Sequence, residues 1–78
     1  MPKFLDAHPL KGLDDETLKK LQAATADEYG IKHLNLMWNR GEDKFYCLLE
    51  APNKQAVKDH HGKHGLECEW ITEVQTTS

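Results

Sequence analysis

The sequence of 78 residues lacks several features that define large classes of proteins. It has only two cysteines, Cys47 and Cys68, which are too few for a secreted disulfide framework and do not have C-x-x-C spacing. No apolar run approaches the roughly 18 residues of a membrane span, and the first residues lack the apolar core of a signal peptide. We therefore expect reduced thiols, no membrane partner and a cytoplasmic location.

The chain is also short and carries little positive charge. Lys and Arg total 10 against 13 Asp and Glu, which gives a formal net charge of −3 and no basic stripe. Binding to a phosphate backbone then has little electrostatic support, so we expect no nucleic-acid partner. Residues 1–78 form one domain at most, and a core this small supplies about 3–5 kcal/mol. A metal or a second subunit is therefore expected to add stability.

The residues that are present alternate between strand and helix patterns. Period-two runs predict strands over residues 3–8, 31–39, 44–51 and 67–74. Two capped amphipathic segments predict helices, one from Asp14 to Gly30 and one from Asn53 to His64. The order strand, helix, strand, strand, helix, strand is that of an α+β, ferredoxin-like βαββαβ unit. Such a unit has a four-stranded antiparallel sheet with two helices on one face.

The alternation also predicts which side chains face the helices. The more apolar set is expected there: Leu5, Ala7, Leu34, Leu36, Trp38, Phe45, Cys47, Leu49, Trp70 and Val74. The opposite face would carry a mixed set: Phe4, Asp6, His8, Ile31, His33, Asn35, Met37, Tyr46, Leu48, Glu50 and Ile71. Because such a face is too apolar to leave in water, we expect a second copy to cover it and form a homodimeric α/β barrel.

Histidine is the most unusual residue in the composition, with five copies, three of which fall on the second predicted helix. At 100° per residue, His60, His61 and His64 share the inward stripe, and His60 and His64 have the i, i+4 spacing that lets two rings converge on one ion. The topology brings His8 and Cys68 toward the same end of the sheet. Imidazole with a thiolate or carboxylate suits nickel or zinc. The other interpretation is that these histidines are half-buried, hydrogen-bonded filler.

Four more polar residues, Asp6, His33, Tyr46 and Glu50, would line the interior of the expected barrel. They could act as acid–base groups toward a small-molecule ligand, as in a cofactor-free monooxygenase or isomerase of the dimeric α/β-barrel kind. That enzyme is the alternative function. Cys47 is expected to be an inert buried thiol, and no catalytic residue follows from the sequence.

Several stretches resemble a known family: residues 1–5 with His8 and Gly12, then 42–52, 60–66 and 71–74. The chain is similar to a family of small bacterial proteins, long classed as a domain of unknown function, that includes a nickel-binding, nickel-responsive member. The resemblance implies a ferredoxin-like fold, a dimeric α/β barrel and nickel binding. We therefore predict a small cytoplasmic homodimer that binds a divalent transition metal, nickel before zinc, and buffers or senses it.

Overall fold

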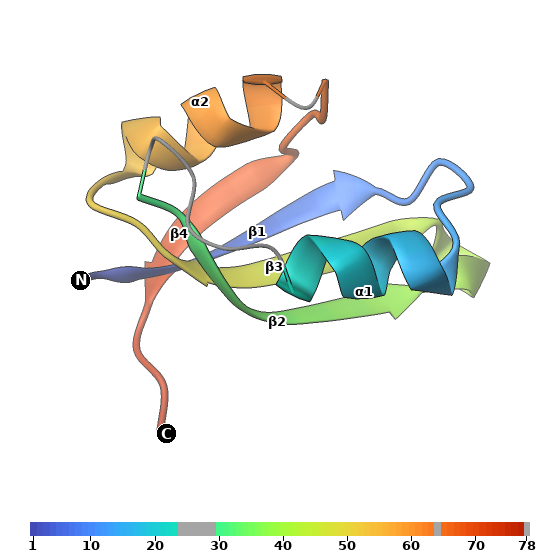
Figure 1. Ribbon diagram of the computed structural model, residues 1–78, viewed down its shortest axis with the longest axis horizontal. Helices are drawn as coiled ribbons and strands as arrows, with labels where there is room; N and C mark the ends of the chain where they lie inside the picture. The colour runs from blue at the N-terminus through green and yellow to red at the C-terminus, as the bar shows by residue number, and fades with distance from the viewer. Residues whose placement is uncertain (24–29, 64, 78) are drawn as a thin grey trace.

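The computed structural model describes residues 1–23, 30–63 and 65–77. The elements follow in the order β1 (Lys3–Pro9), α1 (Asp15–Ala23), β2 (Lys32–Asn39), η1 (Arg40–Glu42), β3 (Lys44–Glu50), α2 (Lys54–Lys63) and β4 (Trp70–Val74). Apart from the short 3-10 turn η1, this is the predicted βαββαβ order, and the chain has the ferredoxin-like α+β fold (Figure 1). Among the described residues, no helix is long and apolar enough to cross a membrane.

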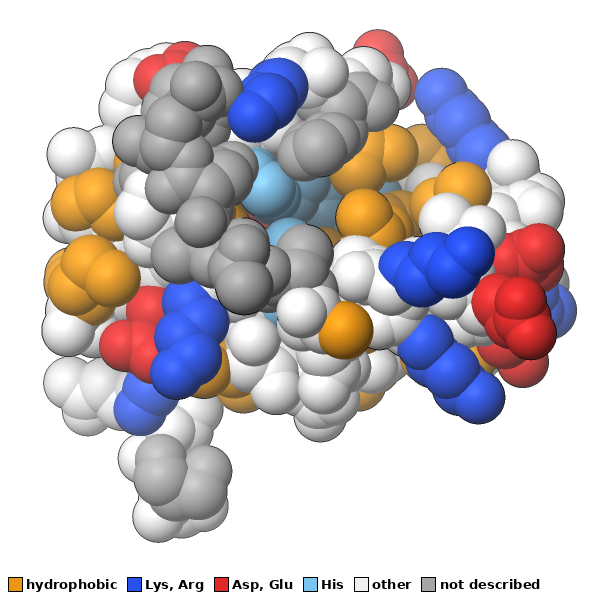
Figure 2. Space-filling model, in the orientation of Figure 1, with side chains coloured by type: hydrophobic (Ala, Val, Ile, Leu, Met, Phe, Trp, Pro, Cys, Tyr) orange, Lys and Arg blue, Asp and Glu red, His pale blue; other side chains and the backbone are white. Residues whose placement is uncertain are grey.

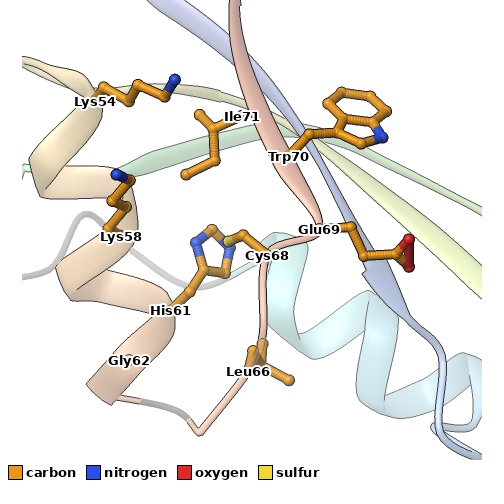
Figure 3. Close-up of a pocket in the computed structure, with 9 residues that line it drawn as sticks. All are labelled: Lys54, Lys58, His61, Gly62, Leu66, Cys68, Glu69, Trp70 and Ile71. Atoms are coloured by element: carbon orange, nitrogen blue, oxygen red, sulfur yellow. The ribbon is translucent and has the colours of Figure 1, made fainter.

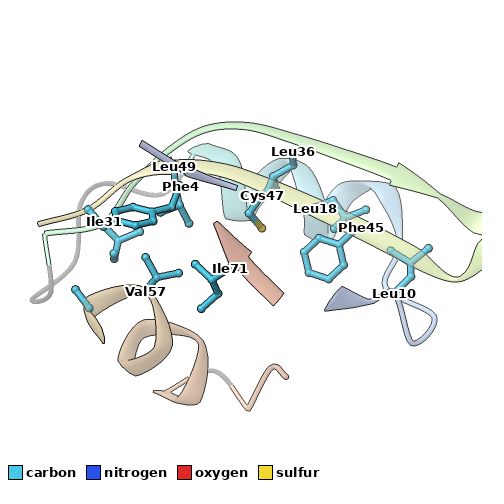
Figure 4. Packing of buried hydrophobic residues seen from close by; sticks show 12 residues of the cluster. Phe4, Leu10, Leu18, Ile31, Leu36, Phe45, Cys47, Leu49, Val57 and Ile71 are labelled. Carbon is cyan, nitrogen blue, oxygen red and sulfur yellow. The ribbon is translucent and has the colours of Figure 1, made fainter. Parts of the chain in front are cut away.

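The four strands form one antiparallel sheet in the order β2-β3-β1-β4, so β1 and β3 lie in its centre. Helix α1 packs beside β2, and α2 lies nearest β4 (Figure 1). Both helices cover the same face, which is called here the covered face; the other is the open face. The main hydrophobic cluster lies between the sheet and the helices (Figure 4): Phe4, Leu10, Leu18, Ile31, Leu36, Phe45, Cys47, Leu49, Ala51, Ala56, Val57 and Ile71.

Both helices begin at the predicted caps. The Asp14 carboxylate accepts a hydrogen bond from the Thr17 N–H at 2.8 Å, and the Asn53 amide oxygen accepts one from the Ala56 N–H at 2.8 Å. Each bond satisfies one of the backbone donors that the first turn of a helix leaves free. Residues 24–29 of the first predicted helix lie outside the described residues.

The end of α2 is fixed by a glycine. Gly65 has a φ of 69°, in the left-handed region that glycine adopts without strain. The Leu66 N–H donates to the His61 carbonyl at 2.9 Å, and the Gly65 N–H donates to the Gly62 carbonyl at 3.1 Å. These two bonds form the Schellman motif, and they turn the chain back toward β4.

The predicted orientation of β3 is correct, but that of β1 is wrong. The register places three residues of β1 opposite buried residues of β3: Phe4 with Leu49, Asp6 with Cys47, and His8 with Phe45. Directly opposite residues share a face, so these three β1 side chains point toward the helices, and Leu5 and Ala7 point to the open face. Apolar residues occur on both faces of β1, so hydropathy does not decide which face turns toward the helices. Pairing with the neighbouring strands decides it, and this choice is called here the phase of β1.

Strands β2 and β4 also depart from the expected pattern. In β4, Ile71 is buried and pairs with Asp6, whereas Trp70 is 44% exposed. In β2, a register shift after His33 places that residue opposite the buried Leu49, so it lies on the covered face rather than the open one. A bulge of this kind inserts an extra residue and interrupts the period of two.

Candidate metal centre

Four side chains with metal-ligating atoms meet beneath α2: Asp6, His8, Cys47 and His61, called here the buried cluster. One ligand atom from each lies within 4.8 Å of the others. Asp6 and Cys47 face each other across β1 and β3, His8 is two residues further along β1, and His61 reaches down from α2. Asp6 and His8 are 0% exposed, and Cys47 and His61 are 2% exposed. Four polar groups withdrawn from water to this degree require partners.

His8 is held at both ring nitrogens. Its Nδ1–H donates to the Glu67 carbonyl at 2.9 Å, and its Nε2 lies 2.6 Å from Asp6 Oδ1. Burial by itself lowers the pKa of His8, but hydrogen bonds with Asp6, Cys47 and Cys68 and the charge of Asp6 outweigh that effect and raise it to about 12. Without a metal, His8 is therefore an imidazolium whose Nε2–H donates a hydrogen bond to Asp6 Oδ1.

His61 is held at one nitrogen only. Its Nδ1–H donates to the Val57 carbonyl, one helical turn earlier, at 2.7 Å. Burial lowers the pKa of His61 to about 4, so the ring is neutral and its Nε2 carries a lone pair. That nitrogen faces Asp6 Oδ2 at 3.4 Å, and Asp6 Oδ2 has no hydrogen-bond partner among the described residues. Two electron-pair donors thus face each other with no proton between them.

This arrangement fits a divalent metal ion. Each histidine of the buried cluster donates its Nδ1–H to a backbone carbonyl, which fixes its tautomer and aims Nε2 at the Asp6 carboxylate. Metal-ligating histidines are oriented in this way. Burial raises the pKa of Cys47 to about 12, so the thiol keeps its proton until a metal displaces it. Two imidazoles, a thiolate and a carboxylate form a donor set for a borderline ion such as nickel or zinc.

Only some of the ligands predicted from the sequence lie in the buried cluster. His8 and His61 belong to the buried cluster. His60 is buried on α2 with its ring centroid 5.2 Å from that of His61, but it is not one of the four. His64 lies outside the described residues, so the predicted pair with His60 is not described. Cys68 is half-buried, is not one of the four, and contributes to the raised pKa of His8. Figure 2 shows histidine side chains in a hollow between α1 and α2.

The pocket expected on the open face does not bring its four residues together. Asp6 and His33 lie on the covered face, where the His33 ring is 5.3 Å from the ring of His60. Tyr46 and Glu50 stay on the open face. The four residues expected to line a barrel pocket therefore do not share one face, because the orientation of β1 and the bulge in β2 place Asp6 and His33 on the other.

Two members of the buried cluster were not predicted as ligands from the sequence. Asp6 was expected on the open face, and Cys47 was expected to be inert. The usable signal was the spacing Asp6-x-His8 on one strand, which places both side chains on one face. This spacing and the cysteine on the neighbouring strand predict a common site only when it is known which face of β1 turns toward the helices.

Comparison with known proteins gives a family and a fold. A family model described as "Nickel responsive protein SCO4226-like" matches residues 4–74. Among solved structures, the crystal structure of SCO4226 from Streptomyces coelicolor A3(2) matches with a TM-score of 0.79 and 22% sequence identity, over 97% of this chain and 99% of that chain. At this identity the match establishes the fold. No curated protein matches the chain.

Proposed function

The chain belongs to the nickel-responsive SCO4226-like protein family, and we propose that it binds a divalent transition metal, nickel, in the buried cluster. One observation carries the proposal: Asp6 Oδ2 is fully buried, has no hydrogen-bond partner among the described residues and faces the unprotonated Nε2 of His61 at 3.4 Å. An unsatisfied buried polar atom costs about 1–3 kcal/mol, and more when it is charged. A cation bound between these two atoms removes that cost.

Each residue of the buried cluster has a distinct part in the proposal. His8 and His61 offer Nε2, held in place by the carbonyls of Glu67 and Val57. Asp6 supplies Oδ2 and negative charge, and Cys47 supplies sulfur. The protons on His8 Nε2 and on the Cys47 thiol leave when the ion binds. The ion then links α2 to the two central strands.

This linkage supports a role in buffering or sensing nickel, because metal binding is coupled to the docking of a helix. We place this role in the cytoplasm, since both cysteines are free thiols and a reducing compartment keeps them so. Zinc suits the donor set equally well by chemistry, but no comparison supports it. Nickel is preferred because it is the metal in the family's description.

Calorimetric titration of the tag-free protein with nickel, and separately with zinc, tests the proposal. We expect saturable heat at one nickel ion per chain, and loss of that heat in His61→Ala and Cys47→Ser. His60→Ala is the matched control, since it removes the neighbouring buried histidine of the same helix and should still bind. Heat of dilution alone for the wild type would rule out the site. Loss in His60→Ala with binding kept in His61→Ala would favour a site formed by the helix alone.

We also propose that a second copy covers the open face. Its central positions are apolar, with Leu5 and Leu48 directly paired, and large side chains remain accessible at its margins, where Met37 is 40% and Trp70 is 44% exposed. A chain of 78 residues gains burial from such a contact. Sedimentation equilibrium should give twice the chain mass of 8.9 kDa, and Leu48→Glu should halve it. A monomer at micromolar concentration would contradict the proposal.

A further inference from the structure

The buried cluster is closed on the side of the sheet. Asp6 and Cys47 project from the two central strands, whose paired backbones form the floor. The Phe45 ring stacks against His8 with centroids 4.7 Å apart and covers that flank. Every member is at most 2% exposed, so an ion has to pass between α2 and the elements beside it to reach the cluster.

A groove of about 420 Å³ opens at that side, between α2 and β4 (Figure 3). His61 forms part of its wall, so the groove reaches a member of the buried cluster. Cys68 also lines it, from the segment that connects α2 to β4. Lys54 and Lys58, one turn apart on α2, line the same groove.

Cys68 is placed to contact both the groove and the buried cluster. Its thiol is free and half-buried, it lines the groove together with His61, and it is one of the groups that raise the pKa of His8. The sulfur of the buried Cys47 lies within 4.8 Å of a ring nitrogen of the same imidazole, on the side of the sheet. Two soft sulfur ligands therefore lie around one histidine, and one of them lines the groove.

We infer that the groove between α2 and β4 is the path by which a divalent metal ion reaches the buried cluster, and that Cys68 is its first protein ligand on that path. The inference rests on the proposed function. At capture, a metal–water bond breaks, a metal–sulfur bond to Cys68 forms, and the thiol proton goes to solvent. At transfer, that bond breaks as bonds to His61 Nε2 and Cys47 sulfur form; Cys47 releases its proton, and Cys68 takes one up.

The two lysines should slow the approach of the metal ion through the groove, whereas Cys68 should speed it. Two positive side chains beside the groove repel a dication, and like charge at a binding site slows encounter rather than changing the bound state. A transient thiolate ligand offsets this repulsion. Cys68 and Lys58 should therefore both affect the rate of binding, in opposite directions.

Stopped-flow measurement of nickel association and dissociation with the full chain tests the inference. In Cys68→Ser we expect both rates to fall together by about tenfold, which corresponds to about 1.4 kcal/mol in the barrier that the two directions share. The dissociation constant then stays unchanged, because a group that acts only on the path alters both directions equally. Lys58→Ala should associate faster, and Cys47→Ser should bind more weakly. A weaker dissociation constant in Cys68→Ser, or rates equal to wild type, would overturn the inference.

Alkylation by iodoacetamide gives a readout that needs no bound metal. In the metal-free protein Cys68 should react and Cys47 should not, and bound nickel should leave the rate at Cys68 unchanged because the ion lies deeper. An unreactive Cys68, or one protected by nickel as a resident ligand would be, contradicts the path. If the wild type binds no nickel, the proposed function fails and the path fails with it. If the wild type and Cys47→Ser behave as stated but Cys68→Ser matches wild type, the path fails alone.

Discussion

The two helices cover the same face of the sheet with different chemistry. Helix α1 buries Leu18 and packs the partly buried Leu21 against the hydrophobic cluster, as does Leu13 just before the helix. Helix α2 buries Ala56 and Val57 in its first half and two histidines in its second. One helix thus meets the sheet through apolar side chains, and the other meets it through imidazoles over a buried carboxylate.

The difference between the two helices indicates that the contact under α1 serves stability and that the contact under α2 serves function. Apolar burial stabilises the fold at about 25 cal/mol per Å², whereas buried charges generally contribute no more than apolar residues of the same volume would. Asp6, His8 and His61 are therefore not the residues expected if stability alone decided the contact under α2. A local departure from the rules of stable packing is expected at functional sites. The following predictions test this division, from the largest effect to the smallest.

Removing the carboxylate under α2 should have the largest effect on the metal-free protein. Asp6→Ala removes the counter-charge and hydrogen-bond partner of His8, which is 0% exposed, and forces the buried ring to give up its proton, so we expect a loss of about 3–5 kcal/mol in the free energy of unfolding. Urea denaturation at neutral pH measures it. The double variant Asp6→Leu with His8→Leu should recover most of the loss, because no charge is then buried. A loss below about 1 kcal/mol in Asp6→Ala would show that the pair is not charged.

Removing the central leucine of α1 should cost nearly as much but leave the site intact. Leu18 is 1% exposed, and Leu18→Ala should lower the free energy of unfolding by about 2–5 kcal/mol through lost burial and the remaining cavity. Nickel affinity, measured by calorimetry, should stay within about threefold, since Leu18 supplies no ligand atom to the buried cluster. A large loss of affinity would mean that the two halves of the covered face are coupled.

Added nickel should stabilise the folded chain through the α2 side of the covered face. At a free nickel concentration 100 times the dissociation constant, a ligand that binds only the folded state adds about 2.7 kcal/mol to the free energy of unfolding. Urea denaturation with and without nickel should show this increment in the wild type and in Leu18→Ala, and show none in His61→Ala. An equal increment in His61→Ala would place the ion elsewhere.

The smallest effects are expected at the two helix caps, which differ in charge. Asn53→Ala should cost about 1 kcal/mol at every pH, since the amide does not titrate. Hydrogen bonds from the side chain and backbone of Thr17 hold the pKa of Asp14 below its usual value. The stabilisation from Asp14 is therefore complete above the ordinary aspartate pKa and is lost as the pH falls through the lower, folded-state value. Unfolding of Asp14→Ala and wild type should converge in acid; a difference that persists there would contradict the titration.

The local parts of the fold could be predicted because they depend on neighbouring residues. The caps at Asp14 and Asn53 and the stop at Gly65 each rest on short-range hydrogen bonds or on backbone freedom, and the structure has all three. The inward stripe of α2 was predicted for the same reason, since helical spacing alone brings His60 and His61 to one side. The choice of His61 as the residue over Asp6 depends on where α2 lies above β1, and no local pattern encodes that position.

What the sequence by itself determined is the order of elements, the caps at Asp14 and Asn53, the stop at Gly65 and the apolar face of β3, since these follow from periodicity and from residues within one or two turns. What only the tertiary structure decided is the phase of β1, and with it the candidate site. Strands that carry apolar residues on both faces take their orientation from their neighbours. Pairing with β3 and β4 turns Asp6 and His8 inward, to Cys47 on one side and to His61 above. The few cysteines and many histidines of the composition acquire a chemical relation only through that pairing.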